Sequence, residues 1–207
     1  MPGSYNLRNN QLFLRNCFEM VGKYDIPLIR KQEVDLTNIK LIACSHTKSN
    51  ETNVFRQYGV HFYVDDYRFN GIYNNPEQTL QKYAQYRFLL TPDFSTYAEM
   101  PISLQIHNVF RNRWCGAYWQ SQGLTVFPTI SWSTSQSFDF CFEGVKQNAI
   151  VSVGMVGCKG NKLNFLRGYD KMLEKLNPQA IICYAKPFKE MQGNIIYVPF
   201  AHTRKEA

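Results

Sequence analysis

The sequence predicts a single α/β domain built around a mainly parallel sheet. Seven short apolar runs of strand length recur along the 207 residues, and stretches with helical spacing separate most of them. Most of these runs are continuously hydrophobic, which is typical of strands covered on both faces. The length suits one well-buried core, because domains usually hold about 100–200 residues.

The predicted strands end at polar turns, and the alternation of strand, turn and helix indicates a parallel sheet. They cover residues 39–44, 60–64, 87–91, 124–130, 149–153, 180–184 and 195–198.

Three helices are well marked. Asn75, Pro76 and Gln78 supply an N-cap, a first-turn proline and a capping-box side chain, which predicts a helix over 75–86. A longer helix over 101–122 begins at Pro101 and ends at Gly123. In the third, over 162–176, apolar residues recur at spacings of three and four until Asn177-Pro178 ends the helix.

The remaining segments are assigned from weaker patterns. An amphipathic helix over 10–21, with Phe13, Cys17 and Met20 on one stripe, is expected to pack on the core. It begins the N-terminal part, residues 1–35, whose second half is an extended lead-in, and residues 199–207 form a tail. A short helix is predicted over residues 51–58. Residues 137–143 fit either a strand or a helix, and Gly144 favours the helix.

Two architectures satisfy this order of elements: a small or incomplete TIM-like βα barrel, and an open doubly wound sheet. The barrel is favoured, because six consecutive βα steps occur without a long crossover that would mark a reversal of strand order.

Composition excludes several classes of protein. Hydrophobic residues make up 44% and charged residues 19%, so neither disorder nor a fibrous repeat is indicated. No apolar run approaches the roughly 20 residues that span a bilayer, and the N-terminus lacks the apolar core of a signal peptide. The six cysteines are scattered singly, which favours reduced structural thiols over disulfides or zinc ligands. We therefore expect a cytoplasmic protein without membrane contact.

The positive charge is concentrated in the last third of the chain. The formal net charge is +7, and residues 145–207 carry ten Lys and Arg against four Asp and Glu. Such a surplus favours contact with nucleic acid or a phosphorylated ligand, although a solvated surface explains it equally well.

In both architectures ligands bind beyond the carboxyl ends of the parallel strands. The candidate residues that follow successive strands are His46, then Asp65 and Asp66, then Asp93, then Trp132, then Gly154, Gly157 and Lys159, and finally Lys186.

The aspartates suit two kinds of chemistry. One role is to bind a divalent cation through Asp65, Asp66 and Asp93, because converging carboxylates suit hard cations. The other is proton transfer by Asp65 and Asp93, because neighbouring carboxylates raise each other's pKa. Aspartates after strands are also common turn formers and helix caps.

The other candidates suit anion or base contacts. The glycine-rich stretch 154–160 offers backbone amides and Lys159 to an anion, although it matches no phosphate-loop fingerprint and glycines also serve ordinary turns. His46 is a candidate acid–base group, with a structural role as the alternative. Trp132 follows a strand directly and is expected to line a pocket.

The helix around residues 108–120 mixes arginines with large aromatic side chains. Arg111 and Arg113 would contact phosphates and the rings would stack on bases, whereas helix–sheet packing accounts for the same rings in another way.

Across 24–186 the sequence resembles an uncharacterised family, a domain of unknown function found in bacteria, phages and mobile elements. The resemblance lies in Tyr-Asp-Ile-Pro at 24–27, Thr-Pro-Asp-Phe-Ser at 91–95, Asn-Val-Phe-Arg-Asn-Arg at 108–113, Gly-Leu-Thr-Val-Phe-Pro-Thr-Ile-Ser-Trp at 123–132 and Phe-Asp-Phe-Cys-Phe-Glu-Gly at 138–144. It implies an accessory protein of a phage or mobile element, working inside a bacterial host cell, and it implies no catalytic roles.

The leading functional prediction is a pocket at the strand ends that binds a phosphorylated ligand or nucleic acid. As an enzyme, the protein would use Asp65 and Asp93 for metal or proton chemistry, with a divalent cation as the one cofactor suggested. A second hypothesis is a non-catalytic module that holds nucleic acid or a host protein with the basic last third. A third is a structural or assembly component with an exposed apolar patch and a stable oligomeric state.

Overall fold

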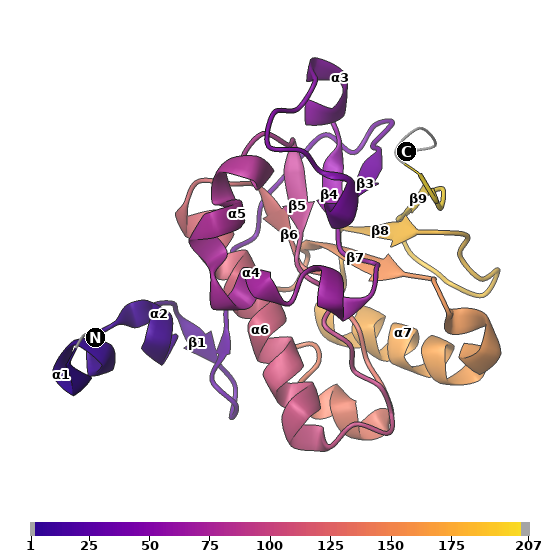
Figure 1. The fold of residues 1–207 in the computed structure, drawn as a ribbon. Coiled ribbons are helices and arrows are strands. Elements are labelled where there is room, and N and C mark those ends of the chain that lie inside the picture. Colours follow the sequence, from indigo (N-terminus) through magenta and orange to yellow (C-terminus); the bar gives the residue numbers. More distant parts are fainter. Residues whose placement is uncertain (1–2, 204–207) are drawn as a thin grey trace.

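The computed structural model describes residues 3–203 and contains two parallel sheets (Figure 1). The first sheet has the order β3-β4-β5-β6, and the second has the order β7-β8-β9. The strands are β3 (Leu41–Ala43), β4 (Gly59–His61), β5 (Phe88–Leu90), β6 (Val126–Phe127), β7 (Ile150–Gly154), β8 (Ala180–Tyr184) and β9 (Ile195–Val198). All seven predicted strands are therefore present, several of them shortened at their ends.

A parallel bridge joins the two sheets beyond the end of β6. Thr129 pairs with Ser152, whose backbone N–H donates to the Pro128 carbonyl at 2.9 Å and whose carbonyl accepts from Ile130 at 2.8 Å. The seven strands thus follow one another in space in the order in which they occur along the chain.

The α/β class with a mainly parallel sheet is confirmed. Within residues 3–203 the edge strands β3 and β9 do not pair, so the sheet is open and the expected barrel is not closed. The strand order also shows no reversal of the kind found in doubly wound sheets.

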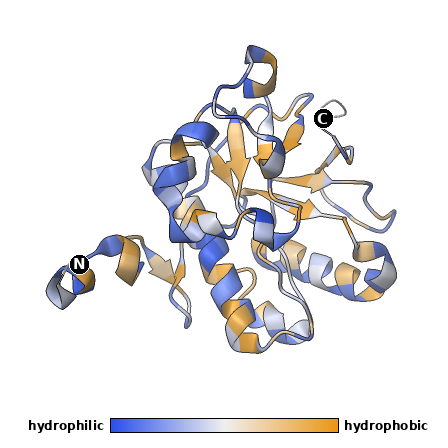
Figure 2. Ribbon diagram, in the orientation of Figure 1, coloured by the Kyte–Doolittle hydropathy of each residue, from blue (hydrophilic) through white to orange (hydrophobic). Residues whose placement is uncertain are grey.

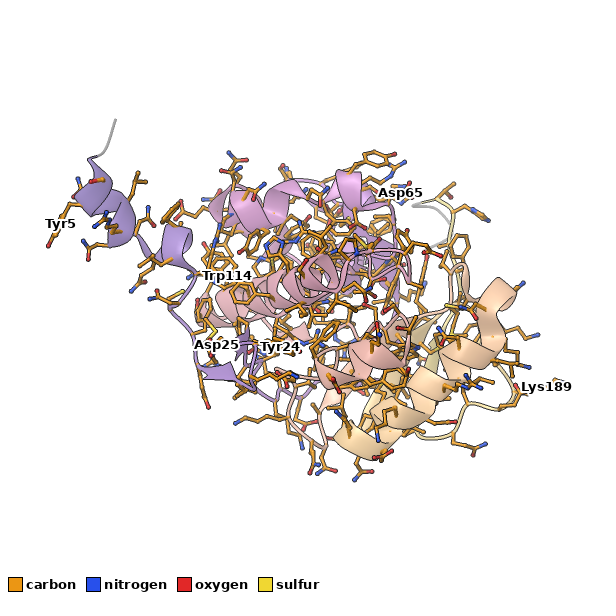
Figure 3. All side chains as sticks on the ribbon, turned by 90° about the horizontal axis from the view of Figure 1, so that it is seen from below. Tyr5, Tyr24, Asp25, Asp65, Trp114 and Lys189 are labelled. Atoms are coloured by element: carbon orange, nitrogen blue, oxygen red, sulfur yellow. The ribbon has the colours of Figure 1, made fainter. Side chains whose placement is uncertain are left out.

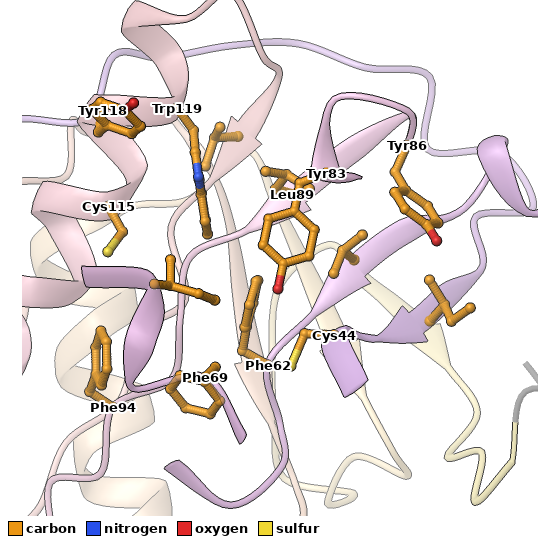
Figure 4. Packing of buried hydrophobic residues seen from close by; sticks show 14 of the residues in the cluster. Cys44, Phe62, Phe69, Tyr83, Tyr86, Leu89, Phe94, Cys115, Tyr118 and Trp119 are labelled. Carbon is orange, nitrogen blue, oxygen red and sulfur yellow. The ribbon is translucent and has the colours of Figure 1, made fainter. Parts of the chain in front are cut away.

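Helices cover the outer face of the sheet. They are α3 (Asn53–Arg56), α4 (Gly71–Asn74), α5 (Pro76–Tyr83), α6 (Ile102–Ser121) and α7 (Lys162–Leu176). Figure 4 shows how Tyr83 of α5 and Trp119 of α6 pack around Phe62, which follows β4. On the second sheet, Tyr169, Met172 and Leu176 of α7 pack against strand residues such as Val151 and Ile181.

The opposite face of the sheet brings the two halves of the molecule together. Side chains of β3, β5 and β6 meet those of β7, β8 and β9 in one buried cluster that includes Leu41, Phe88, Phe127, Ile150 and Ile182. Figure 2 shows the hydrophobic character of the strands that contribute to it. Because apolar side chains cover both faces, the strands lack the alternation of polar and apolar residues.

The N-terminal segment differs from the prediction. Instead of one helix over 10–21, it forms the short helices α1 (Ser4–Arg8) and α2 (Gln11–Leu14) and the antiparallel pair β1 (Met20–Val21) and β2 (Ile26–Pro27). Arg15 adopts a left-handed conformation with φ of 59° and ends α2. Its guanidinium lies over the rings of Tyr73 and Trp114, at 4.4 and 4.1 Å from their centroids.

The predicted apolar stripe is consequently split between two elements. Phe13 is 63% exposed, whereas Met20 pairs with Pro27 in the hairpin. Figures 1 and 3 show α1 standing away from the rest of the molecule, with Tyr5 at its end. The extended Ile-Pro step is confirmed by β2, and residues 204–207 of the predicted tail lie outside the described residues.

The other helix predictions hold with local changes. Helix α7 has its predicted bounds, and α6 begins one residue after Pro101. Asn75 precedes α5 but its side chain makes no capping hydrogen bond, so the capping-box prediction is wrong. The ambiguous segment 137–143 contains the end of a 3-10 helix, Ser135–Asp139, followed by turns.

Two further expectations from the sequence concern the state of the cysteines and membrane-spanning helices. The six cysteines are all free, and four of them are buried. Between residues 3 and 203, no helix combines the length and the apolar character needed to cross a membrane.

Candidate functional site

The carboxyl ends of β4, β5, β6 and β7 surround a pocket of about 320 Å³. Acidic, hydroxyl-bearing, aromatic and aliphatic residues line it: Tyr63, Val64, Asp65, Asp66, Asp93, Ser95, Thr96, Tyr97, Ile130, Ser131, Trp132, Gly154, Val156, Cys158 and Phe165. Its volume lies at the lower end of the roughly 300–1,000 Å³ that is common for small-ligand sites. The pocket occurs at the edge of the sheet where the strand order led us to expect one.

Asp66 is held in place by the loop after β5. The backbone N–H of Ser95 donates to one carboxylate oxygen at 3.1 Å, and the Ser95 hydroxyl donates to the other at 2.8 Å. Asp65, its neighbour, is exposed and lies 4.0 Å from the Arg68 guanidinium. Asp66 is therefore the fixed carboxylate of this pair, and Asp65 belongs to the outer edge of the pocket.

Asp93 is the carboxyl group of this pocket whose pKa is raised far above its ordinary value. Burial raises its pKa to about 7, and the nearby charge of Asp66 acts in the same direction. A hydrogen bond from Ser131 and the positive charge of Arg113 oppose this rise. The carboxyl group therefore changes charge near neutral pH, which is a property of groups that exchange protons with ligands.

Tyr63 lies at the base of the pocket, two residues beyond β4. Its hydroxyl shares a hydrogen bond with Ser152 of β7, and its ring stacks on Tyr184 at 5.4 Å. Burial, followed by the charge of Asp93, raises the pKa of Tyr63 well above its usual value, so the phenol remains neutral. A Cβ at Gly154 would come within 2.5 Å of this ring, so the glycine makes room for Tyr63.

Aromatic side chains form the opposite wall. The Trp132 ring lies 5.0 Å from Phe165 of α7, and a Cβ at Gly168 would come within 2.2 Å of Trp132. The indole therefore packs directly on the α7 backbone, and Gly168 allows that approach. Tyr97 and Val156 line the pocket from the outside and are 64% and 51% exposed.

Polar side chains on the buried face of α6 hold the loop that carries Asp93. The Asn112 amide donates to the Pro92 carbonyl at 2.8 Å, and the Asn108 amide donates to the Ser95 carbonyl. Further along the same loop, Gln105 donates to Met100 at 2.8 Å. These bonds fix the backbone on both sides of Asp93.

Arg113 has a structural role, in contrast to its predicted contact with a ligand. It is 1% exposed and donates to the backbone carbonyls of Thr129, Cys141 and Glu143 at 2.9 to 3.0 Å. It thereby ties the segment after β6 to the turns that precede β7. Burial lowers its pKa to about 10, yet the guanidinium still carries its charge at neutral pH.

Arg111 also turns toward the protein. It lies 3.9 Å from the centroid of Phe94, and it donates to Asn108. Both arginines of α6 therefore contact the scaffold of the pocket, and Arg111 remains half-buried whereas Arg113 is fully enclosed. Trp114 and Trp119 of this helix are fully buried, as the packing alternative proposed.

The structure brings together some of the predicted site residues. Asp65, Asp66, Asp93, Trp132 and Gly154 line one pocket. Three other predicted residues lie outside the pocket lining: His46, Lys159 and Lys186. His46 belongs to a 3-10 helix after β3, Lys159 belongs to a 3-10 helix after β7, and Lys186 follows β8. Gly157 also lies outside the lining, with a φ of 79°.

The three aspartates do not form a metal site. Among the described residues, no three or more His, Cys, Asp or Glu side chains gather in a way that would hold a metal ion. The expectation of a cation bound by Asp65, Asp66 and Asp93 together is therefore not supported by their arrangement.

Several pocket residues were not predicted. Tyr63 falls at the end of a predicted strand, and Ser95 and Tyr97 follow Asp93 closely, so reading further along each loop would have found them. Phe165 comes from the helical stripe of α7, where nothing in the sequence distinguishes a pocket residue from a core residue. Cys158 also lines the pocket, and burial together with the charge of Asp93 raises its pKa to about 11.

Comparison with known proteins identifies the family. The model of the domain of unknown function DUF4417 matches residues 18–201. The chain belongs to this family. It is also similar to a "Gene 1 protein" of Mycobacterium phage L5, 35% identical over 188 residues that cover 89% of this chain and 80% of the phage protein.

A "Gene 1 protein" of Mycobacterium phage D29 shows the same identity over the same length, which is 67% of that protein. No solved structure matches the chain. The predicted relationship to an uncharacterised, phage-associated family is thereby confirmed.

Proposed function

We propose that the protein binds a ligand carrying a nucleobase, and that the base enters the pocket at the strand ends. The observation that supports this proposal is the combination of two partly buried carboxyl groups, Asp66 and Asp93, with aromatic walls. Carboxylates accept hydrogen bonds from the amino and ring N–H groups of a base. Aromatic rings stack on its flat faces, as in other pockets that hold a single base.

The charge of the pocket favours the base over the phosphate as the group inside it. None of the described residues that line the pocket is Lys, Arg or His, whereas three of them are aspartates. A phosphate inside would be repelled by these carboxylates and would have no cation beside it. The predicted phosphorylated ligand is thus compatible with this pocket only if its phosphate remains outside.

The proposal is tested by thermal melting in the presence of the nucleosides of adenine, guanine, cytosine and uracil, with ribose as the probe lacking a base. A ligand that binds the folded form raises the melting temperature. We expect at least one nucleoside to do so and ribose to have no effect. If no nucleoside changes the melting temperature at millimolar concentration, the proposal is wrong.

Two variants and one control connect this binding to the pocket. Asp66→Asn and Asp93→Asn remove a charged acceptor and are each expected to weaken nucleoside binding about tenfold or more, because hydrogen bonds to charged groups contribute about 1.5–3 kcal/mol. Asp170→Asn changes an exposed aspartate on α7 and is expected to leave the binding unchanged. Equal losses in all three variants would contradict the proposed site.

The raised pKa of Asp93 favours a second candidate function, acid–base catalysis on the bound ligand. A carboxyl group with a pKa of about 7 is present in both protonation states at neutral pH and is suited to proton transfer. Turnover of a nucleoside, followed by chromatography between pH 5 and 9, would change near pH 7 in the original protein. Loss of that turnover in folded Asp93→Asn would support catalysis, and turnover that persists would exclude Asp93 as the proton carrier.

A further inference from the structure

We infer that the natural ligand is a single-stranded nucleic acid, with one base in the pocket and the neighbouring nucleotides lying across its mouth. The inference rests on the proposed function and concerns the surface around the pocket. We define this surface, the rim, by Tyr67, Tyr97, Val156 and the loops that follow β7 and β8.

Exposed rings are the first observation. Tyr97 lines the pocket and is 64% exposed, and Tyr67, which directly follows the pocket residue Asp66, is 71% exposed. A free nucleoside held in the pocket would leave most of the surface of these two rings in water. Bases of a single strand stack on exposed aromatic rings in a way that tolerates any sequence.

Positive charge on the segments that follow β7 and β8 is the second observation. Lys159 lies one residue from the pocket residue Cys158, and Lys162 begins α7. Lys186 and Lys189 belong to the loop after β8, shown at the edge of the molecule by the label of Lys189 in Figure 3. These four lysines therefore lie on the loops that directly follow β7 and β8 or at the start of α7.

Contacts between side chains connect the loop after β8 to the pocket. Phe188, between Lys186 and Lys189, packs edge-on against the pocket residue Phe165, with ring centroids 5.7 Å apart. Lys162 lies 5.3 Å from the centroid of Phe188 and forms an ion pair with Glu190 at 2.7 Å. Lys159, Lys186 and Lys189 are exposed, so their charge faces solvent.

The distribution of charge thus changes from negative inside the pocket to positive on the rim. This pattern is complementary to a nucleotide strand, whose bases donate hydrogen bonds and whose phosphates are anionic. A duplex fits the rim less well, because its bases are paired and stacked and would have to be extruded before they reached the pocket or the rings. The rim and the pocket together therefore favour a single strand.

The experiment measures binding of fluorescein-labelled nine-nucleotide DNA by anisotropy at 50, 100 and 200 mM salt. Four oligonucleotides carry adenine, guanine, cytosine or thymine at the centre of an otherwise constant thymine sequence, and a matched duplex serves as the comparison. We expect the single strand to bind at least tenfold more tightly than the best nucleoside. We also expect its affinity to fall as salt increases, because bound counterions are released.

A matched pair of double variants locates the interaction. Lys159→Gln with Lys186→Gln removes two charges from the rim, and Lys40→Gln with Lys146→Gln removes two from the opposite edge, where Lys40 precedes β3 and Lys146 precedes β7. We expect the rim variant to bind the strand roughly tenfold less tightly and with a smaller salt dependence, because each lost phosphate contact lowers the slope by about one. Its nucleoside binding should remain within twofold of the original, and the control variant should bind both probes normally.

Tyr67→Ala tests the stacking contribution separately. We expect about tenfold weaker binding of the strand and unchanged binding of the nucleoside, because Tyr67 lies outside the pocket lining.

The outcomes distinguish the two proposals. If nucleosides bind but the strand binds no more tightly, or if the duplex binds as well as the strand, the inference about the rim is overturned and the proposed function stands. If the control variant loses as much affinity as the rim variant, the inference is also overturned. If the strand binds through the rim while no nucleoside binds and Asp66→Asn has no effect, the base does not enter the pocket, and both proposals fail.

Discussion

The two walls of the pocket are built in different ways. The wall that carries Asp66, Asp93 and Ser131 consists of the loops after β4, β5 and β6, and buried side chains of α6 hold its backbone by hydrogen bonds. The other wall includes the loop after β7, residues 155–161, which we call the glycine loop. Here Cys158 donates from its backbone to Met155 at 3.3 Å, and a Cβ at Gly157 or Gly160 would meet no atom within 4 Å.

The difference between the walls indicates a division of tasks. Groups that recognise a ligand by hydrogen bonds must be held in one geometry, and the wall supported by α6 provides this for the carboxyl groups. The glycine loop contributes apolar contacts and charge, and these interactions with a ligand tolerate small displacements of the loop. Substitutions in the supported wall should therefore cost much more stability than substitutions in the glycine loop.

The largest effect is expected for Arg113→Met. This change keeps the length of the side chain but removes a buried donor from the carbonyls of Cys141, Glu143 and Thr129 and from the Asn112 amide oxygen. The last two acceptors each keep a second donor, Asn112 and Thr91 respectively. We expect the free energy of unfolding, measured with urea, to fall by about 3–4 kcal/mol. Arg167→Met, at an exposed position of α7, should change it by less than about 0.5 kcal/mol. Similar values for both variants would contradict the role of α6 as a support.

A smaller effect, dependent on pH, is expected for Asp93→Asn. The pKa of Asp93 rises from 3.8 to about 7 on folding, so the folded state holds this proton more tightly than the unfolded chain does. Stability therefore falls as the pH rises from about 4 to 7, and the asparagine variant escapes this loss. We expect Asp93→Asn to be more stable by about 2–4 kcal/mol at pH 8, with a difference close to zero near pH 4.

Urea unfolding at pH 4, 5, 6, 7 and 8 measures this difference. Asp170→Asn, at an exposed position, should stay within about 0.5 kcal/mol of the original protein at each pH. A constant difference between Asp93→Asn and the original protein across the range would show that burial does not raise the pKa of Asp93.

A loss of about 1 kcal/mol is expected for Ser95→Ala. The hydroxyl donates to Asp66, while the backbone N–H of the same residue donates to the other carboxylate oxygen and is retained in the variant. Nucleoside binding should weaken by a few fold, because Asp66 keeps only part of its support. Thr203→Ala, at an exposed position near the end of the described chain, is the control for loss of a hydroxyl. Binding that is lost completely in Ser95→Ala would mean that Ser95 itself contacts the ligand.

The smallest effect is expected in the glycine loop, for Gly160→Ala. An added Cβ meets nothing within 4 Å, so unfolding in urea should change by less than about 0.5 kcal/mol. Gly157→Ala should cost about 1–2 kcal/mol, because a φ of 79° disfavours any residue with a side chain. A cost at Gly160 equal to that of Arg113→Met would remove the difference between the two walls.

The sequence was sufficient to predict the strands and the edge of the sheet where the pocket lies. Continuous apolar runs locate buried parallel strands well, and residues that follow consecutive parallel strands must gather at one edge. For this reason the order of the strands alone places Asp66, Asp93 and Trp132 in one site. The residue that contributes from a helix, Phe165, required the packing of α7.

Two errors have identifiable physical causes. Residues 10–21 show helical spacing, but the cation–aromatic contacts of Arg15 with Tyr73 and Trp114 and the pairing of β1 with β2 are long-range interactions that spacing does not reveal. The segment 108–120, which contains Arg111 and Arg113, has the mixture of arginines and aromatic residues that is typical of a nucleic-acid surface. That composition does not show which side of the helix faces the sheet. The buried carbonyls of Thr129 and Cys141 accept hydrogen bonds from Arg113, whereas Arg111 donates to the Asn108 side chain and lies over the Phe94 ring.

The agreement between strand order and chain order has a consequence for synthesis on the ribosome. Each new strand from β4 to β9 can add to an edge that has already emerged, so the sheet can grow in one direction while translation continues. The N-terminal hairpin is the exception, because Ile29, which follows it closely, pairs with Val145 and can reach its final position only after Val145 has been made. The N-terminal hairpin is therefore among the last segments to dock.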